Sequence, residues 1–218
     1  MNNQNRLISI QNIPMIVHSD TEYISKRMIK TGMFWEQEIF DRWSKYFPKE
    51  GFILDIGANI GTHTLQFYKH SSHLKIWAFE IHPKNFELLR QNTLNYSQIS
   101  CFNVGVGSAN SIVNFSDGAS DDDDNKGGVK VSVDGKNRNL VFALDTFIFP
   151  EPVTFIKIDI EEHELSAFEG MKNLLLRDKP TIWLEDFTGY ATNYLISLGY
   201  EKLEVINSTS DFLMKFKY

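Results

Sequence analysis

The chain has 218 residues, a formal net charge of −6 and a single cysteine. This length suits one large α/β domain. The negative charge argues against a broad electrostatic surface for nucleic acid, and one cysteine excludes an intrachain disulfide. No signal-peptide pattern and no apolar run of membrane-spanning length is present, so we expect a soluble cytoplasmic protein without a membrane span.

Residues 1–50 are expected to form an N-terminal arm and a helix. Short alternating apolar pieces within residues 1–30 indicate an accessory strand or arm. Residues 33–47, MFWEQEIFDRWSKYF, place their apolar side chains close to helical spacing, and Pro48 to Gly51 end this predicted helix. Its Trp35 is expected in the core, although an indole could also stack on a sugar.

Residues 51–107 alternate short apolar strands with helices and form the predicted cofactor-binding half. The predicted strands are 52–57, 74–80 and 100–106. Helices are predicted after Gly61 and from Pro83 onward, since proline suits a first helical position.

Residues 108–140 break this rhythm and are predicted to be a β-hairpin insertion. Two alternating stretches, SIVNF and VKVSV, flank a link rich in Gly and Asp. Within the link, Asp121 to Asp124 lack the Gly and Glu of a calcium loop, so a solvated hairpin tip is expected there.

Residues 141–218 are predicted to be the catalytic and substrate-binding half of the same single domain. Strands are predicted at 153–160 and 180–186, with a helix after each. The segments YEKLEVI and DFLMKFK read as a closing antiparallel hairpin. Strands that alternate with helices imply a mostly parallel sheet with right-handed crossovers.

The most specific signal is the turn DIGANIGT at residues 55–62, between the first predicted strand and helix of the alternating region. Glycines let the backbone approach a ligand closely. Ligands of open α/β sheets bind outside the carboxyl ends of the strands, and a helix N-terminus favours an anion such as a carboxylate. Because Asp55 could accept from an ammonium group, the turn suits a cofactor that carries an amino acid.

Glu80 ends the next predicted strand. An acid at this position can accept hydrogen bonds from both ribose hydroxyls of a nucleotide cofactor. The turn and the acid together fit NAD or S-adenosylmethionine. The turn is GANIG rather than GxGxxG, and the closing hairpin disfavours a dehydrogenase.

Charged residues interrupt the end of the predicted strand 153–160, in the segment KIDIEEHE. A strand buried on both faces should be nearly all apolar, and unpaired buried charge is costly. Lys157 and Asp159 therefore either pair with each other and with Glu161, or line a cleft. For Glu162 and Glu164 helix capping is an equally good explanation.

Three segments resemble the FkbM family of methyltransferases: DIGANIGTHT, WAFEIHPKNFELLRQNTLNY and FIKIDIEEHELSAFEGM, in this order across about residues 35–186. The family motifs are an Asp-Gly-Ala-Asn turn, a Phe-Glu-Pro segment and Lys-Ile-Asp-Val-Glu-Gly-x-Glu. Two positions depart from them: Ile81-His82 stands where proline often follows the glutamate, and Glu162 where glycine is usual.

The resemblance implies a class I methyltransferase Rossmann-like α/β fold: a mostly parallel seven-stranded sheet with a terminal antiparallel hairpin and helices on both faces. It implies S-adenosylmethionine as cofactor and O-methylation of a sugar or natural-product hydroxyl. The cofactor-binding residues it implies are Glu36, Asp55, Gly57, Ala58, Asn59, Gly61, Glu80, Ile81, Val104, Gly105 and Val106. The turn would hold the methionine end, Glu80 the ribose, and residues 103–107 the adenine. Glu36 would reach the cofactor from the N-terminal helix, or else be solvated there.

Methyl transfer from a sulfonium needs the acceptor oxygen, methyl carbon and sulfur in line, and such positioning supplies about 7–11 kcal/mol. A sugar hydroxyl also needs a base or a metal to help it lose its proton. The predicted catalytic residues are Asp159, Glu161 and His163, with the acids favoured over the histidine. The candidates for holding a divalent cation such as Mg²⁺ are Asp159, Glu161, Glu185 and Asp186.

Other functions stay open at this point. No Asn/Asp-Pro-Pro-aromatic motif follows residue 158, which favours oxygen over nitrogen as the methyl acceptor. A methyltransferase acting on a protein or lipid, a NAD-binding oxidoreductase and a non-catalytic adenosylmethionine-binding module are the alternatives. The expected partner is a small-molecule or glycan hydroxyl acceptor.

Overall fold

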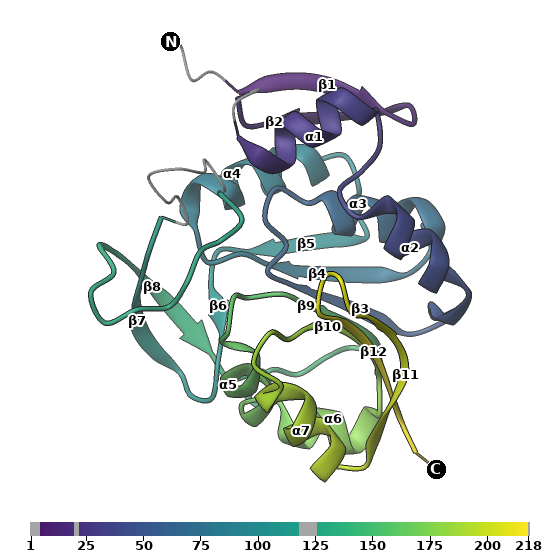
Figure 1. Cartoon of the computed structure of the whole chain (residues 1–218), viewed down its shortest axis with the longest axis vertical. Coiled ribbons are helices and arrows are strands. Elements are labelled where there is room, and N and C mark those ends of the chain that lie inside the picture. Colours follow the sequence, from purple (N-terminus) through teal and green to yellow (C-terminus); the bar gives the residue numbers. More distant parts are fainter. Residues whose placement is uncertain (1–4, 20–21, 118–125, 218) are drawn as a thin grey trace.

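The computed structural model describes residues 5–19, 22–117 and 126–217. Seven strands form the central sheet: β3 (Phe52–Ile56), β4 (Lys75–Phe79), β5 (Ile99–Phe102), β9 (Val153–Ile158), β10 (Thr181–Glu185), β11 (Tyr200–Ile206) and β12 (Asp211–Phe216). Their order is β11-β12-β10-β9-β3-β4-β5 (Figure 1). Strand β12 runs antiparallel to both of its neighbours, whereas β5, β4, β3, β9 and β10 pair in parallel. The predicted mostly parallel sheet with a closing hairpin is confirmed.

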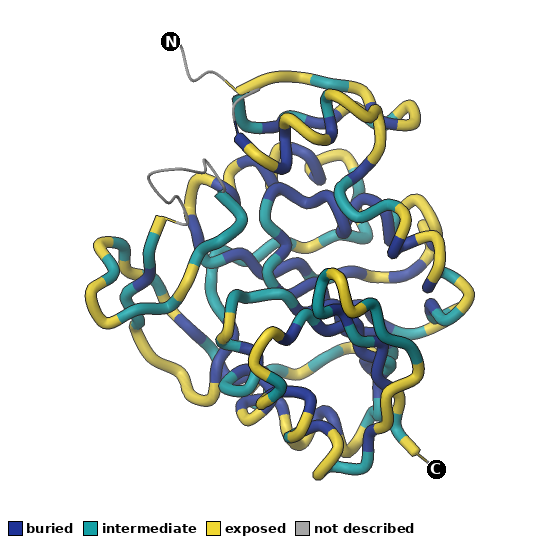
Figure 2. Tube along the Cα trace, in the orientation of Figure 1, coloured by how far each residue is buried: buried dark blue, intermediate teal, exposed yellow. Residues whose placement is uncertain are grey.

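Helices cover both faces of this sheet because successive side chains of a strand point to opposite sides. Ile53, Phe155 and Trp183 pack against α2 (Gln37–Trp43) and α3 (Thr62–His70). The residues next to them in each strand, such as Leu54, pack against α5 (Glu164–Glu169), α6 (Lys172–Asp178) and α7 (Tyr190–Ser197). The middle strands are therefore buried on both faces, as Figure 2 shows.

The N-terminal region is more than the expected strand or arm. Strands β1 (Arg6–Ile10) and β2 (Ile13–Val17) form a hairpin, and α1 (Tyr23–Thr31) follows it. Helix α1 begins where the Glu22 carboxylate accepts from two backbone N–H groups and ends at Gly32, whose φ is 68°. The hairpin is joined to α4 (Pro83–Thr93) through Asn92, whose amide exchanges two hydrogen bonds with the backbone of Ile16.

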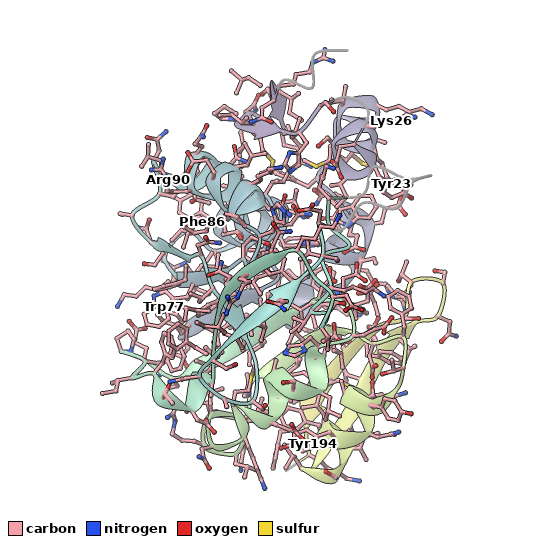
Figure 3. The ribbon with its side chains drawn as sticks, turned by 90° about the vertical axis from the view of Figure 1, so that its left-hand side faces the viewer. Tyr23, Lys26, Trp77, Phe86, Arg90 and Tyr194 are labelled. Carbon is pink, nitrogen blue, oxygen red and sulfur yellow. The ribbon has the colours of Figure 1, made fainter. Side chains whose placement is uncertain are left out.

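The two ends of the molecule carry different helices. In the turned view of Figure 3, Tyr23 and Lys26 of α1 lie at one end and Tyr194 of α7 lies at the other. None of the helices in the described part of the chain combines the length and the apolar character that crossing a membrane requires.

The helix predicted over residues 33–47 is shorter in the structure. Glu36 has a left-handed φ of 55°, so α2 begins only at Gln37, and a 3-10 turn, η1 (Ser44–Tyr46), replaces its last part. The helix predicted after residue 160 is divided into α5 and α6. These local departures leave the aromatic side chains of α2 in the core, as predicted.

The predicted hairpin insertion is wrong in its strand pairing. Strand β7 (Ser111–Phe115) pairs with β8 (Asn137–Phe142), whereas the VKVSV stretch contributes only a single bridge, from Val131 to Phe115. The third predicted strand is also split, because β6 (Gly105–Val106) leaves β5 and joins β8 in parallel. The acidic run Asp121–Asp124 lies outside the described residues.

Candidate functional site

A cavity of about 260 Å³ lies at the carboxyl ends of β3, β4, β9 and β10. Parallel strands end at one edge of a sheet, so the residues that follow them meet there. Most predicted site residues line this cavity: Glu36, Gly57, Ala58, Asn59, Glu80, Ile81, Val104, Gly105, Val106, Asp159, Glu161, His163 and Glu185. Asp55, Gly61 and Asp186 lie outside its lining.

The glycine turn after β3 is held against the end of β9. Gly57 has a φ of 81°, and a Cβ there would lie 1.8 Å from the carbonyl oxygen of Asp159. The backbone N–H groups of Gly57 and Ala58 both donate to the carbonyl of Phe79 at the end of β4. Only glycine permits this approach, which brings the turn and the charged end of β9 into one site.

Asn59 presents an acceptor to the cavity. Its side-chain Oδ1 is buried and has no hydrogen-bond partner among the described residues. Because a buried polar atom without a partner is costly, this oxygen is suited to accept a hydrogen bond from a ligand. Gly61, with φ at 91°, instead starts α3 behind the cavity wall.

The structure does not bring Asp55 to the cavity. Its side chain is fully buried, and one carboxylate oxygen accepts a hydrogen bond from the Thr64 hydroxyl of α3. Asp55 also pairs in register with Lys157 of β9. This aspartate therefore stabilises the sheet end from behind, and the geometry does not support its expected contact with an ammonium group.

Glu80 bridges the glycine turn and the end of β4. Its Oε2 accepts from the backbone N–H of Asn59 at 2.9 Å, and its Oε1 accepts from that of His82 at 2.7 Å. Burial raises the pKa of Glu80 to about 7, although the two hydrogen bonds oppose the shift. Each carboxylate oxygen has a second lone pair, so both can still accept from ligand hydroxyls.

Beyond Glu80 the cavity is apolar. Ile81, Val104 and Val106 line it, and three further valines that were not predicted complete the wall: Val129, Val131 and Val141. The backbone carbonyl of Ile81 is held by the side-chain amides of Asn103 and Asn139. The alternation in VKVSV was a usable signal, since it places Val129 and Val131 on one face.

At the opposite end, the buried Lys157 and the partly exposed Asp159 form an ion pair of 3.0 Å, and both residues line the cavity. Lys157 and Asp159 therefore pair with each other and also line the cavity, whereas the expected pairing with Glu161 is not formed. Burial by itself would lower the pKa of Lys157, but the surrounding carboxylates, Asp159 first, outweigh it and raise the pKa. Burial would likewise raise the pKa of Asp159, but the lysine charge holds it low.

Glu185, at the end of β10, shares a hydrogen bond with Asp159. Burial and then the negative charge of Asp159 raise the pKa of Glu185, so this side chain keeps its proton while Asp159 is ionised. Two carboxyl groups in contact repel each other when both are ionised, and a single proton on one of them removes this repulsion.

The loop after β9 turns sharply at Glu161 and Glu162, whose φ values are 55° and 73°. Glu161 lines the cavity without a hydrogen bond or ion pair to any described residue, and burial followed by the Asp159 charge raises its pKa. Glu162 is exposed and pairs with Lys130. A left-handed φ explains why glycine is usual at position 162.

His163 and Glu164 complete this loop. Burial lowers the pKa of His163, so its cavity-lining imidazole is neutral at neutral pH. Glu164 Oε1 accepts from the backbone N–H groups of Ile160 and Glu162 in the loop before α5, so this acid has a structural role that differs from the expected helix cap.

His63 in the first turn of α3 lines the cavity and was not predicted. Its Nε2 lies 3.3 Å from the Glu36 carboxylate, and its ring meets that of Trp183 edge-on at 4.9 Å. Its position directly after the glycine turn was the only sequence signal. Glu36, expected to be either a cofactor contact or a solvated residue, faces this histidine.

The residues predicted to hold a cation do not fit that role. Asp186 turns away and accepts from the backbone N–H groups of Thr188, Gly189 and Thr192, which caps α7. Asp159 is committed to Lys157 and Glu185. Within the described ranges, no three His, Cys, Asp or Glu side chains converge in a way that could hold a metal ion.

Comparison with known proteins identifies the family of the chain. Residues 55–202 match the methyltransferase FkbM domain. The hexuronic acid methyltransferase AglP of Haloferax volcanii is 26% identical over 145 residues, which cover 64% of this chain and 58% of that protein. The chain thus spans little more than half of this curated relative.

Solved structures show the same fold. A methyltransferase FkbM from Methylobacillus flagellatus KT has a TM-score of 0.55 at 22% identity, covering 78% of this chain and 44% of the other. TYW2 of Pyrococcus horikoshii, solved in complex with MeSAdo, has a TM-score of 0.52 at 12% identity, and the match covers 98% of this chain and 70% of the other. TYW2 of M. jannaschii, solved in complex with AdoMet, has a TM-score of 0.51 at 10% identity, and the match covers 98% of this chain and 84% of the other.

Proposed function

The chain belongs to the FkbM methyltransferase family, and we propose that it transfers a methyl group from S-adenosylmethionine to a hydroxyl oxygen of a sugar, a glycan or a similar small acceptor. The observation that supports the acceptor class is the acid-rich end of the cavity, which Asp159, Glu161 and Glu185 all line. The relative that acts on a hexuronic acid supports a sugar acceptor.

The residues around the cavity fit S-adenosylmethionine. The backbone of the glycine turn lines the cavity through Gly57, Ala58 and Asn59, and the unpartnered Asn59 Oδ1 supplies an acceptor for the methionine end. The Glu80 carboxylate suits the ribose hydroxyls, and Ile81 with Val104 suits the adenine. This arrangement leaves the ends of β9 and β10 for the acceptor.

S-adenosylmethionine supplies an already activated methyl group, so the chain has to orient the acceptor and accept one proton. We assign the proton acceptor to Glu161. Its raised pKa brings it closer to neutral pH, where a general base is most effective. Asp159, held by Lys157, and Glu185 would orient acceptor hydroxyls by accepting hydrogen bonds from them, since the Glu185 proton is used in its bond with Asp159. The neutral His163 is the second candidate for the base.

The test combines binding and turnover. Isothermal titration with S-adenosylmethionine, with NAD as control, is expected to show binding of the former alone. Incubation with S-adenosylmethionine and a panel of methyl hexopyranosides should then yield methyl ethers, detected by mass spectrometry. Preferential NAD binding, or transfer to amines alone, would overturn the proposal. Cofactor binding without transfer to any hydroxyl would favour a non-catalytic binding module.

A further inference from the structure

The strand order separates the two ends of the cavity. Glu80 follows β4 and Phe187 follows β10, and these strands are three positions apart in the sheet. Neighbouring strands are about 4.8 Å apart, so the two strand ends are separated by about 14 Å. Under the proposed function, on which this inference rests, the adenosine occupies the Glu80 side. Phe187 therefore lies at the acceptor end.

Phe187 lines the cavity although 61% of it is exposed. A phenylalanine is more often buried, and an exposed apolar side chain at the rim of a cavity is a common ligand contact. Across the ranges that the structure describes, no aromatic ring or cation packs against the Phe187 ring, which leaves its faces available.

The backbone around Phe187 is fixed. Its neighbour Asp186 is only 4% exposed. The Asp186 carboxylate accepts from the backbone N–H groups of Thr188 at 3.1 Å, Gly189 at 2.8 Å and Thr192 at 2.8 Å. These bonds join the end of β10 to the start of α7 and hold Phe187 between them. A ring presented from a rigid turn loses little conformational freedom when a ligand packs on it.

Trp35, the aromatic residue that the sequence suggested for sugar stacking, also lines the cavity, but its ring is already in contact with two other side chains. Its ring meets Tyr23 at 5.6 Å, and the Arg27 guanidinium lies 5.7 Å from its centre. Phe187 instead stands next to the acids: Glu185 precedes it by two residues, and Glu161 lines the same cavity. A flat apolar face beside carboxyl groups matches a pyranose, which has C–H faces and hydroxyl edges.

The geometry points to Phe187 as the stacking platform for the acceptor. Its ring packs on the C–H face of a sugar ring whose hydroxyl edge meets Glu161 and Glu185. The phenylalanine takes no part in proton transfer, and it sets acceptor affinity and the preference for ring-shaped acceptors.

The test compares Phe187→Ala and Phe187→Leu with Tyr190→Ala. Tyr190 is a matched control, because it is 68% exposed on the first turn of α7 but lies outside the cavity lining. Steady-state kinetics are measured with the best methyl hexopyranoside of the wild-type panel. Phe187→Ala should raise the acceptor KM about tenfold and leave the Kd of S-adenosylmethionine unchanged. The acceptor KM of Phe187→Leu should lie between those of the wild type and Phe187→Ala, and the KM of Tyr190→Ala should match that of the wild type.

Saturation-transfer NMR with the same methyl hexopyranosides, in the presence of S-adenosylhomocysteine, tests the platform without turnover. The wild type should transfer saturation to the ring C–H protons, and Phe187→Ala should lose most of that signal. The inference would be overturned if Phe187→Ala left the signal and the acceptor KM unchanged, or if Phe187→Leu kept the full signal. It would also be overturned if Phe187→Ala weakened cofactor binding as much as acceptor binding, or if the wild type bound no pyranoside. Pyranoside binding that depends on Phe187 without methyl transfer would instead contradict the proposed function alone.

Discussion

The two ends of the cavity are built in different ways. At the proposed cofactor end, the backbone of the glycine turn and the Glu80 carboxylate lie on two short segments that the sheet places side by side. At the proposed acceptor end, the lining side chains come from separate strands and loops: Lys157, Asp159, Glu161, Glu185 and Phe187. Under the proposed function, backbone geometry therefore determines the cofactor, whereas substitution of side chains can change the acceptor.

The energetics differ in the same way. The cofactor end depends on close backbone approach at Gly57, which tolerates no added atom. The acceptor end depends on charge balance, because a buried ion is costly unless it is paired. Lys157 pairs with Asp159, and Glu185 keeps a proton in response. A change at one of these residues therefore shifts the protonation of the others, whereas changes at the turn act locally.

The largest effect is expected for Gly57→Ala, which tests the backbone geometry of the cofactor end. The added methyl collides with the Asp159 carbonyl, at 1.8 Å, in a backbone conformation that alanine rarely adopts. Strain and overpacking together should lower the free energy of unfolding by about 3–5 kcal/mol, measured by urea denaturation.

Gly189→Ala is the matched control for this substitution. Gly189 also has a left-handed φ, of 77°, but a Cβ there meets nothing within 4 Å. Only backbone strain remains, so Gly189→Ala should lower the free energy of unfolding by about 1 kcal/mol. Equal costs for the two variants would mean that the close approach at Gly57 contributes nothing to stability.

The next largest effect is expected for Glu161→Gln, which tests the acceptor end. Glutamine keeps the size of the side chain but cannot accept the hydroxyl proton. Turnover should fall about 10²–10³-fold, while the affinity for S-adenosylmethionine stays unchanged. Glu162→Gln is the control next in the chain, because Glu162 pairs with Lys130 on the exposed side of the loop. Wild-type turnover in Glu161→Gln would transfer the role of base to His163.

The cofactor end was the more predictable one because its signals are local. The strand FILDI, the turn that follows it and the acid after the next strand lie within 30 residues of one another, and parallel strands necessarily bring their ends together. The strands of the central sheet were found because each is a short apolar run between turn residues. The third predicted strand, at residues 100–106, was too long, because β6 looks like a continuation of β5 in the sequence.

The acceptor end was less predictable because side-chain direction depends on tertiary packing. Asp186 was considered as a metal ligand, but the Thr and Gly that follow it make it a helix cap. This sequence is typical of a helix start, so the signal was available. The pairing of β7 with β8 had no such signal in the sequence, because β7 passes over the nearer VKVSV stretch to pair with β8. Nothing in the local sequence marked Phe187 as exposed.

A smaller effect is expected for Glu80→Gln, which removes the negative charge beneath the proposed ribose site. The neutral amide loses charge-assisted acceptance from ribose hydroxyls and weakens the bonds from the Asn59 and His82 N–H groups. Calorimetry should show the Kd for S-adenosylmethionine raised about 10–100-fold. An unchanged Kd would remove Glu80 from the cofactor site and with it the assignment of the two ends.

The smallest effect concerns pH and uses the same carboxylate. Burial raises the pKa of Glu80 to about 7, and the nearby charges of Asp159 and Asp55 act in the same direction. The ionised form accepts from both ribose hydroxyls, whereas the protonated form loses one acceptor. Affinity for S-adenosylmethionine should therefore be highest above pH 7 and should fall by up to about tenfold as the pH is lowered by one unit below that pKa. Titrations from pH 8 to pH 6 measure this, and Glu80→Gln should remove most of the dependence. If the variant keeps the full dependence, the titrating group is not Glu80, and Glu161 is the next candidate because burial raises its pKa.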